Sequence, residues 1–218
     1  MSKSEHPGEK VLSQKAYSFL RKGIIGGKYK PGEPILESAI SKELGVSRTP
    51  VREALKLLEK ENLVNSYPRR GAFITIISLE KIQEIYQIRE IIEGEVARLA
   101  ASYISIDRLS QIEKKLLPIK RKLKRKKNTA IEEAVNVGQE FHDLIFSAFG
   151  NKTLIQIMEN LRVEKERGCN FASRGVGNAI RFLDHHLEII SALKRKNGEK
   201  AKKLLNKHIN DAKESILG

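Results

Sequence analysis

The stretch ESAISKELGVSRTPVREALKLLEKENLVNSYPRRGAFI, residues 37–74, joins two short helical patterns to a basic turn. Gly45 follows the first pattern, where a glycine readily takes the positive φ that ends a helix. Ser47 can cap the free amides of the second helix, and Pro50 is tolerated in its first turn because no intrahelical partner is lost there. Residues 63–66 can extend as a strand and residues 67–71 turn back, which predicts a winged helix-turn-helix.

The second helical pattern has one apolar and one cationic face. At 100° per residue, its apolar and polar side chains separate onto opposite sides. The apolar set is Val51, Ala54, Leu55 and Leu58, and the polar set is Arg48, Thr49, Arg52 and Lys56. An arginine fork matches the O6 and N7 acceptors of guanine. The alternative for such a face is a solvated helix surface, but its place between a turn and a basic wing favours contact with double-stranded DNA.

These residues closely resemble the GntR family of bacterial transcription regulators over roughly residues 10–76. The match is carried by GGKYKPG at 26–32, GVSRTPVREAL at 45–55 and RRGAF at 69–73. In that family the recognition helix and the wing both meet DNA. The resemblance implies a DNA-binding set of Ser38, Ser47, Arg48, Thr49, Arg52, Arg69, Arg70 and Gly71. Ser38 stands where the family often carries another arginine, so a changed operator sequence is expected.

The overall composition bounds the class of protein. The chain has 218 residues and a formal net charge of +14, which suits two domains and a polyanionic partner, although a membrane surface would also attract such a chain. Cys169 is the only cysteine, so a reducing compartment is the simplest fit. The opening residues lack the apolar core of a signal peptide and no apolar run is long enough to span a bilayer. We therefore expect a cytoplasmic protein with no membrane association.

The rest of the chain shows helical periodicity, so the predicted fold is mainly α. We expect a flexible N-terminus at 1–9, the winged helix-turn-helix at 10–77 and an all-α helical bundle at 79–216. Its predicted helices are about 79–104, 107–125, 130–149, 151–167, 178–196 and 198–216, with a break in the glycine-containing region 168–178. The basic run 120–127 is interpreted as a solvated helix end, with phosphate contact as the alternative.

Three histidines fall on inward stripes of three different predicted helices. His142, His186 and His208 each share a face with apolar side chains, whereas His185 should face another way. A single such histidine is most simply a hydrogen-bonded core residue. Three from three helices favour a shared polar cavity, because buried polar groups need partners and imidazole is a common metal ligand.

This half resembles the FCD effector-binding domain of the FadR subgroup of GntR regulators over about residues 79–216. The resemblance rests on YQIREIIEG at 86–94, on Phe141-His142, on His186 and on His208. It implies a divalent metal, such as zinc or nickel, on His142, His186 and His208, and a small carboxylate effector held by these histidines and Arg89. Gly138 stands at the usual aspartate position, so a weakened metal site and a metal-free cavity are both open. Arg89 could instead pair with Glu93.

Together these features predict a sequence-specific transcription regulator, not an enzyme. We expect a homodimer that presents two recognition helices to double-stranded operator DNA, and a repressor whose operator affinity is controlled by a small carboxylate metabolite. The rival hypothesis is a metal-dependent hydrolase that uses the three-histidine cavity. It lacks a convincing general base, since Glu140 and Asp143 do not share the inward face of His142.

Overall fold

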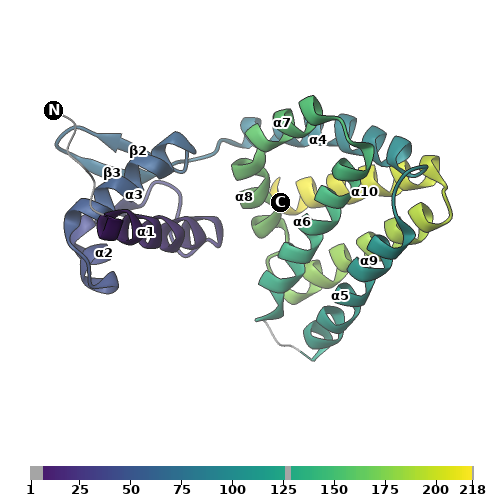
Figure 1. The fold of residues 1–218 in the computed structure, drawn as a ribbon, viewed down its shortest axis with the longest axis horizontal. Coiled ribbons are helices and arrows are strands. Elements are labelled where there is room, and N and C mark those ends of the chain that lie inside the picture. The colour runs from purple at the N-terminus through teal and green to yellow at the C-terminus, as the bar shows by residue number, and fades with distance from the viewer. Residues whose placement is uncertain (1–6, 126–128, 218) are drawn as a thin grey trace. The chain divides into compact units, whose positions relative to one another are not determined.

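The computed structural model describes residues 7–125 and 129–217 and divides the chain into two compact units, Met1–Ile77 and Ser78–Gly218 (Figure 1). The expected flexible segment 1–9 lies outside the described residues except for residues 7–9, which form the first turn of α1 (Pro7–Ile25). No helix among the described residues has the length and apolar content needed to cross a membrane.

The first unit is a winged helix-turn-helix, as predicted. It contains α1, β1 (Pro34–Ile35), α2 (Glu37–Leu44), α3 (Arg48–Lys60), β2 (Val64–Tyr67) and β3 (Gly71–Ile74). The strands form an antiparallel sheet in the order β1-β3-β2. The two-residue strand β1 was not anticipated, because a segment this short has no periodicity to detect.

The apolar stripe of α3 is the core of this unit. Val51, Ala54 and Leu58 are fully buried, and α3 packs against α1. Gly45 ends α2 with a φ of 67°, as expected. Ser47 occupies the N-cap position of α3, but its side chain makes no capping hydrogen bond, so the expected cap is wrong. The opposite face of α3 remains exposed.

The second unit is entirely helical in its described residues. It contains α4 (Leu79–Ala100), α5 (Ile106–Lys124), α6 (Ala130–Phe149), α7 (Lys152–Asn160), α8 (Arg162–Ala172), α9 (Val176–Lys194) and α10 (Gly198–Leu217). Their buried aliphatic and aromatic side chains form one core. Lys120 and Lys122 of the basic run pair with Asp184 and Glu133, whereas residues 126–128 lie outside the described part.

The helix expected at 151–167 is wrong, because it is two helices that meet at Leu161. The break expected within 168–178 lies between the end of α8 at Ala172 and the start of α9 at Val176, where Gly175 has a φ of 83°, whereas Gly168 itself lies inside α8. Gly168 is there for close packing, because a Cβ at this position would lie 2.9 Å from the Tyr86 hydroxyl.

Candidate functional site

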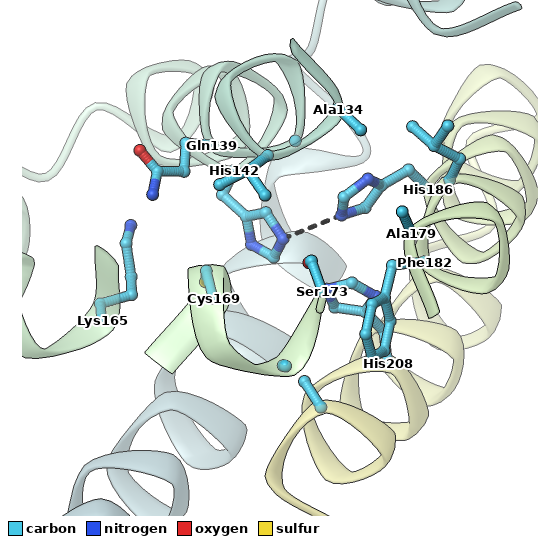
Figure 2. Close-up of a pocket in the computed structure, with 15 residues that line it drawn as sticks. Ala134, Gln139, His142, Lys165, Cys169, Ser173, Ala179, Phe182, His186 and His208 are labelled. Atoms are coloured by element: carbon cyan, nitrogen blue, oxygen red, sulfur yellow. Dashed lines mark hydrogen bonds between the residues drawn. The ribbon is translucent and has the colours of Figure 1, made fainter. Parts of the chain in front are cut away.

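The three predicted histidines converge inside the helical unit. His142 comes from α6, His186 from α9 and His208 from α10, and all three are buried. Each offers a ring nitrogen, and the three atoms lie within 4.8 Å of one another (Figure 2). The inward orientation inferred from helical spacing is therefore confirmed.

The spacing of these nitrogens suits a metal ion. Nε2 of His142 and Nε2 of His186 are 3.3 Å apart, and two imidazole nitrogens on a tetrahedral zinc are about 3.3 Å apart. Nδ1 of His186 and Nδ1 of His208 are buried and have no hydrogen-bond partner among the described residues. Burial, followed by the neighbouring histidines, holds the pKa of His186 and of His208 well below the usual value, so both rings are neutral near pH 7 and can present lone pairs.

A buried ion pair contacts His142 and orients its ring. Arg89 Nε donates to Glu93 Oε1 at 2.7 Å, and Glu93 Oε2 lies 2.6 Å from His142 Nδ1. Arg89 and Glu93 side chains are each 1% exposed. Burial raises the pKa of Glu93, but the charge of Arg89, followed by the contact with His142, outweighs burial and leaves the pKa below its usual range. Glu93 is therefore ionised and accepts the Nδ1 proton of His142, which directs the Nε2 lone pair toward the other histidines.

From the sequence, Arg89 could either bind a carboxylate effector or pair with Glu93, and in the structure it pairs with Glu93. In the part of the chain that the structure describes, Arg89 is not among the residues that line the cavity. The spacing of four residues on one helix allowed the pair to be foreseen. The contact from Glu93 to His142 spans 49 residues of sequence and could not be foreseen.

The histidines border a cavity of about 40 Å³, which has room for a few water-sized groups. Its walls are mostly apolar, and its polar lining beyond the histidines comes from α6, α8 and the residue that follows α8. These polar residues are Gln139, Lys165, Cys169 and Ser173. Sequence reasoning missed the contribution of α8, whose signal is the repeated spacing of four residues from Lys165 through Cys169 to Ser173.

Packing explains the glycine at position 138. A Cβ on Gly138 would lie 2.7 Å from Cε1 of His186, closer than real contacts allow. The His186 ring thus occupies the space in which an aspartate side chain would begin. An aspartate at this position requires the ring to move, and the negative charge that contacts His142 in this structure comes from Glu93.

His185 lies outside the cavity lining, as expected from its place on α9, but it does not face solvent. Its side chain is 12% exposed, and Nε2 lies 3.6 Å from Asp211 Oδ2. His185 and His186 are therefore adjacent, largely buried histidines with different surroundings.

The residues expected to meet DNA are exposed on the first unit. Arg48, Thr49 and Arg52 lie on the open face of α3, and Ser47 precedes them. Arg69 and Arg70 lie in the turn between β2 and β3, Gly71 begins β3, and Ser38 is exposed on α2. Arg52 Nε donates to Glu37 Oε2 at 2.8 Å, which holds its guanidinium beside α2.

The two sites define a class of protein: a DNA-binding transcription regulator that carries a helical ligand-binding domain. The hydrolase hypothesis is not supported, because no carboxylate lines the described cavity and Glu93 is committed to Arg89 and His142. The chain belongs to the GntR family. Residues 12–74 match the model of the bacterial regulatory proteins, gntR family, and residues 84–211 match the FCD domain, which agrees with the FadR-subgroup resemblance.

Known relatives agree with this assignment. The chain is 33% identical over 196 residues to the uncharacterized HTH-type transcriptional regulator YdhC of Bacillus subtilis, covering 89% of this chain and 86% of that one. It is 29% identical over 205 residues to the HTH-type transcriptional repressor RspR of Escherichia coli, covering 94% and 89%. The structure of E. coli McbR/YncC has the same fold, with a TM-score of 0.72, 23% identity and coverage of 91% and 93%.

Proposed function

We propose that this regulator binds a pseudo-palindromic operator as a homodimer and represses transcription until a small carboxylate metabolite enters the three-histidine cavity. The observation that carries the ligand half of this proposal is the convergence of three buried histidines, one of them held by an ionised glutamate. Regulators of this family bind operator DNA and are typically dimeric. Because operator DNA lies in the bacterial cytoplasm, the proposal places the protein there.

Base reading is assigned to the open face of α3. Arg48, Thr49 and Arg52 would contact base edges in the major groove, and Ser38 and Ser47 would contact the DNA beside them. Arg69, Arg70 and Gly71 of the wing would reach the neighbouring groove. The exposure of these residues supports the assignment. The exposed Ser47 makes no capping hydrogen bond, so its hydroxyl could donate to a phosphate.

Metal binding is assigned to His142, His186 and His208, with zinc or nickel as the ion. A bound divalent ion would supply a Lewis-acidic position open to a carboxylate oxygen. Glu93 orients His142, and Arg89 keeps Glu93 ionised; in this proposal Arg89 serves effector binding through Glu93. The apolar walls exclude water from the bound acid, which strengthens its contacts with the polar groups.

A ligand can control operator affinity because the site residues come from four different helices. The histidines belong to α6, α9 and α10, and Glu93 belongs to α4, so a ligand here favours one arrangement of these helices over others. An acid that binds one arrangement better shifts operator affinity by the same coupling free energy with which DNA shifts acid affinity. α4 is also the first helix after the wing along the chain.

Selection of binding sites from random double-stranded DNA tests the DNA half of the proposal. We expect an enriched pseudo-palindrome whose half-sites are about one helical turn, or a multiple of it, apart, because a two-fold dimer presents two recognition helices. Recovery of a single, unrepeated half-site would contradict the dimer. Recovery of no preferred sequence would contradict base reading.

A further inference from the structure

Lys165 is a buried cation that lines the cavity and has no close partner. The residue is 8% exposed. Its one ion pair among the described residues joins Nζ to Asp143 Oδ1 at 3.9 Å, beyond hydrogen-bond length. The Asp143 side chain is 67% exposed, so water screens this pair strongly. A lysine this deeply buried without a hydrogen-bonded anion is costly, and the fold retains it at the edge of the cavity.

The position of Lys165 relates it to the histidines. Lys165 and Gln139 point toward one another in Figure 2, and Gln139 lies one turn before His142 on α6. Both side chains line the same cavity as the histidines. A ligand of a few heavy atoms that reached the histidines would therefore have an ammonium and an amide beside it.

The charged residues around the cavity favour a ligand of negative charge. Among the described residues no aspartate or glutamate lines it, and the two buried glutamates of this unit are paired with arginines, Glu93 with Arg89 and Glu166 with Arg162. Lys165 therefore brings to the edge of the cavity a positive charge that no lining carboxylate offsets. An amine or a neutral ligand would leave this charge unpaired, whereas an acid would neutralise it.

We propose that the Lys165 ammonium, assisted by Gln139, is the anion-binding group of the cavity and receives a carboxylate of a short acid whose other end contacts the histidines. This inference rests on the proposed effector function and sharpens it: the ligand is a short dicarboxylate in preference to a monocarboxylate. Lys165, and not Arg89, determines that preference. Asp143 is the competitor that the incoming carboxylate displaces.

The test uses malonate and acetate as probes on the zinc-loaded full-length protein, dialysed free of excess metal. Melting temperature is followed against acid concentration for the wild type, Lys165→Met, Lys165→Arg and the control Lys203→Met, an exposed lysine on α10. We expect Lys165→Met to raise the half-saturating malonate concentration about tenfold or more, as expected for loss of a charged hydrogen bond. Lys165→Arg should retain most of the response, and Lys203→Met should match the wild type.

A second variant keeps the test decisive if Lys165→Met fails to fold. Asp143 is largely solvated, so Asp143→Asn should fold and should lower the half-saturating malonate concentration by removing the competing carboxylate. An unchanged half-saturating malonate concentration in Asp143→Asn would overturn the role of Lys165, and so would identical malonate curves for the wild type and Lys165→Met. Either result would leave the proposed carboxylate effector standing. If neither acid stabilises the wild type, the carboxylate effector itself is wrong and the inference falls with it.

Discussion

Replacing Arg52 with alanine should weaken binding to the selected operator by about 30-fold or more while barely changing the affinity for random DNA. A bidentate arginine–guanine contact is worth about 1–3 kcal/mol, and a dimer makes it once in each half-site. Arg52 is available for this role because its side chain is 60% exposed. Its ion pair with Glu37 is weak in water, so releasing it costs little. Fluorescence anisotropy with both DNAs, at a single stated salt concentration, measures the difference.

The matched control for this loss is Lys60→Ala. Lys60 is exposed in the last turn of the same helix and lies outside the proposed DNA-binding set. Its removal changes the net charge by the same amount, so it should lower affinity for both DNAs slightly and equally. If Arg52→Ala weakened operator and random DNA by one common factor, α3 would not read bases through this residue.

Replacing His186 with alanine should lower zinc affinity by more than about 100-fold, beyond the effect typical of changing a group that only supports a ligand. One of the three convergent nitrogens is lost, and zinc prefers four. At a zinc concentration about one hundred times the dissociation constant, the wild type gains about 2.7 kcal/mol of stability. That zinc-dependent rise in melting temperature should vanish in His186→Ala. Calorimetric titration of zinc into the metal-free protein gives the affinities.

The neighbouring residue supplies the control. His185→Ala removes an imidazole of similar burial from the same helix, but His185 lies outside the cavity. It should keep wild-type zinc affinity. Glu93→Gln should fall between the two, with a loss of about 10- to 100-fold, because Glu93 only orients His142. Equal zinc affinities for His186→Ala and His185→Ala would contradict the proposed metal site.

Local signals in the sequence were enough to predict the DNA-binding unit. The α3 stripe specifies which face is buried, and Gly45 marks the end of α2, because each effect acts within one or two turns of chain. The periodicity of the second unit likewise oriented His142, His186 and His208 correctly. Helical spacing reports which side chains point inward, and for these residues that was sufficient.

These local signals could not predict which helices contact one another. Periodicity does not say which inward faces meet, so neither the support of His142 by Glu93 nor the place of Lys165 in the cavity could be derived from spacing. The break within 168–178 was predicted, but its position after Gly168 was not, because a glycine that ends a helix and a glycine that admits a neighbouring tyrosine look the same in sequence. The resemblance to FCD domains places Gly138 at the usual aspartate position, and only the structure shows that the His186 ring packs against this glycine.

The central claim is that acid binding at the histidines controls operator binding. The most direct measurement is the operator dissociation constant with and without saturating malonate, made on the wild type and His186→Ala at one zinc concentration that saturates the wild type. The account predicts that malonate weakens operator binding by the wild type about 5- to 150-fold, the usual range of coupling between two sites, and leaves His186→Ala unchanged. Equal operator affinity with and without malonate, at concentrations that raise the melting temperature of the wild type, would contradict it.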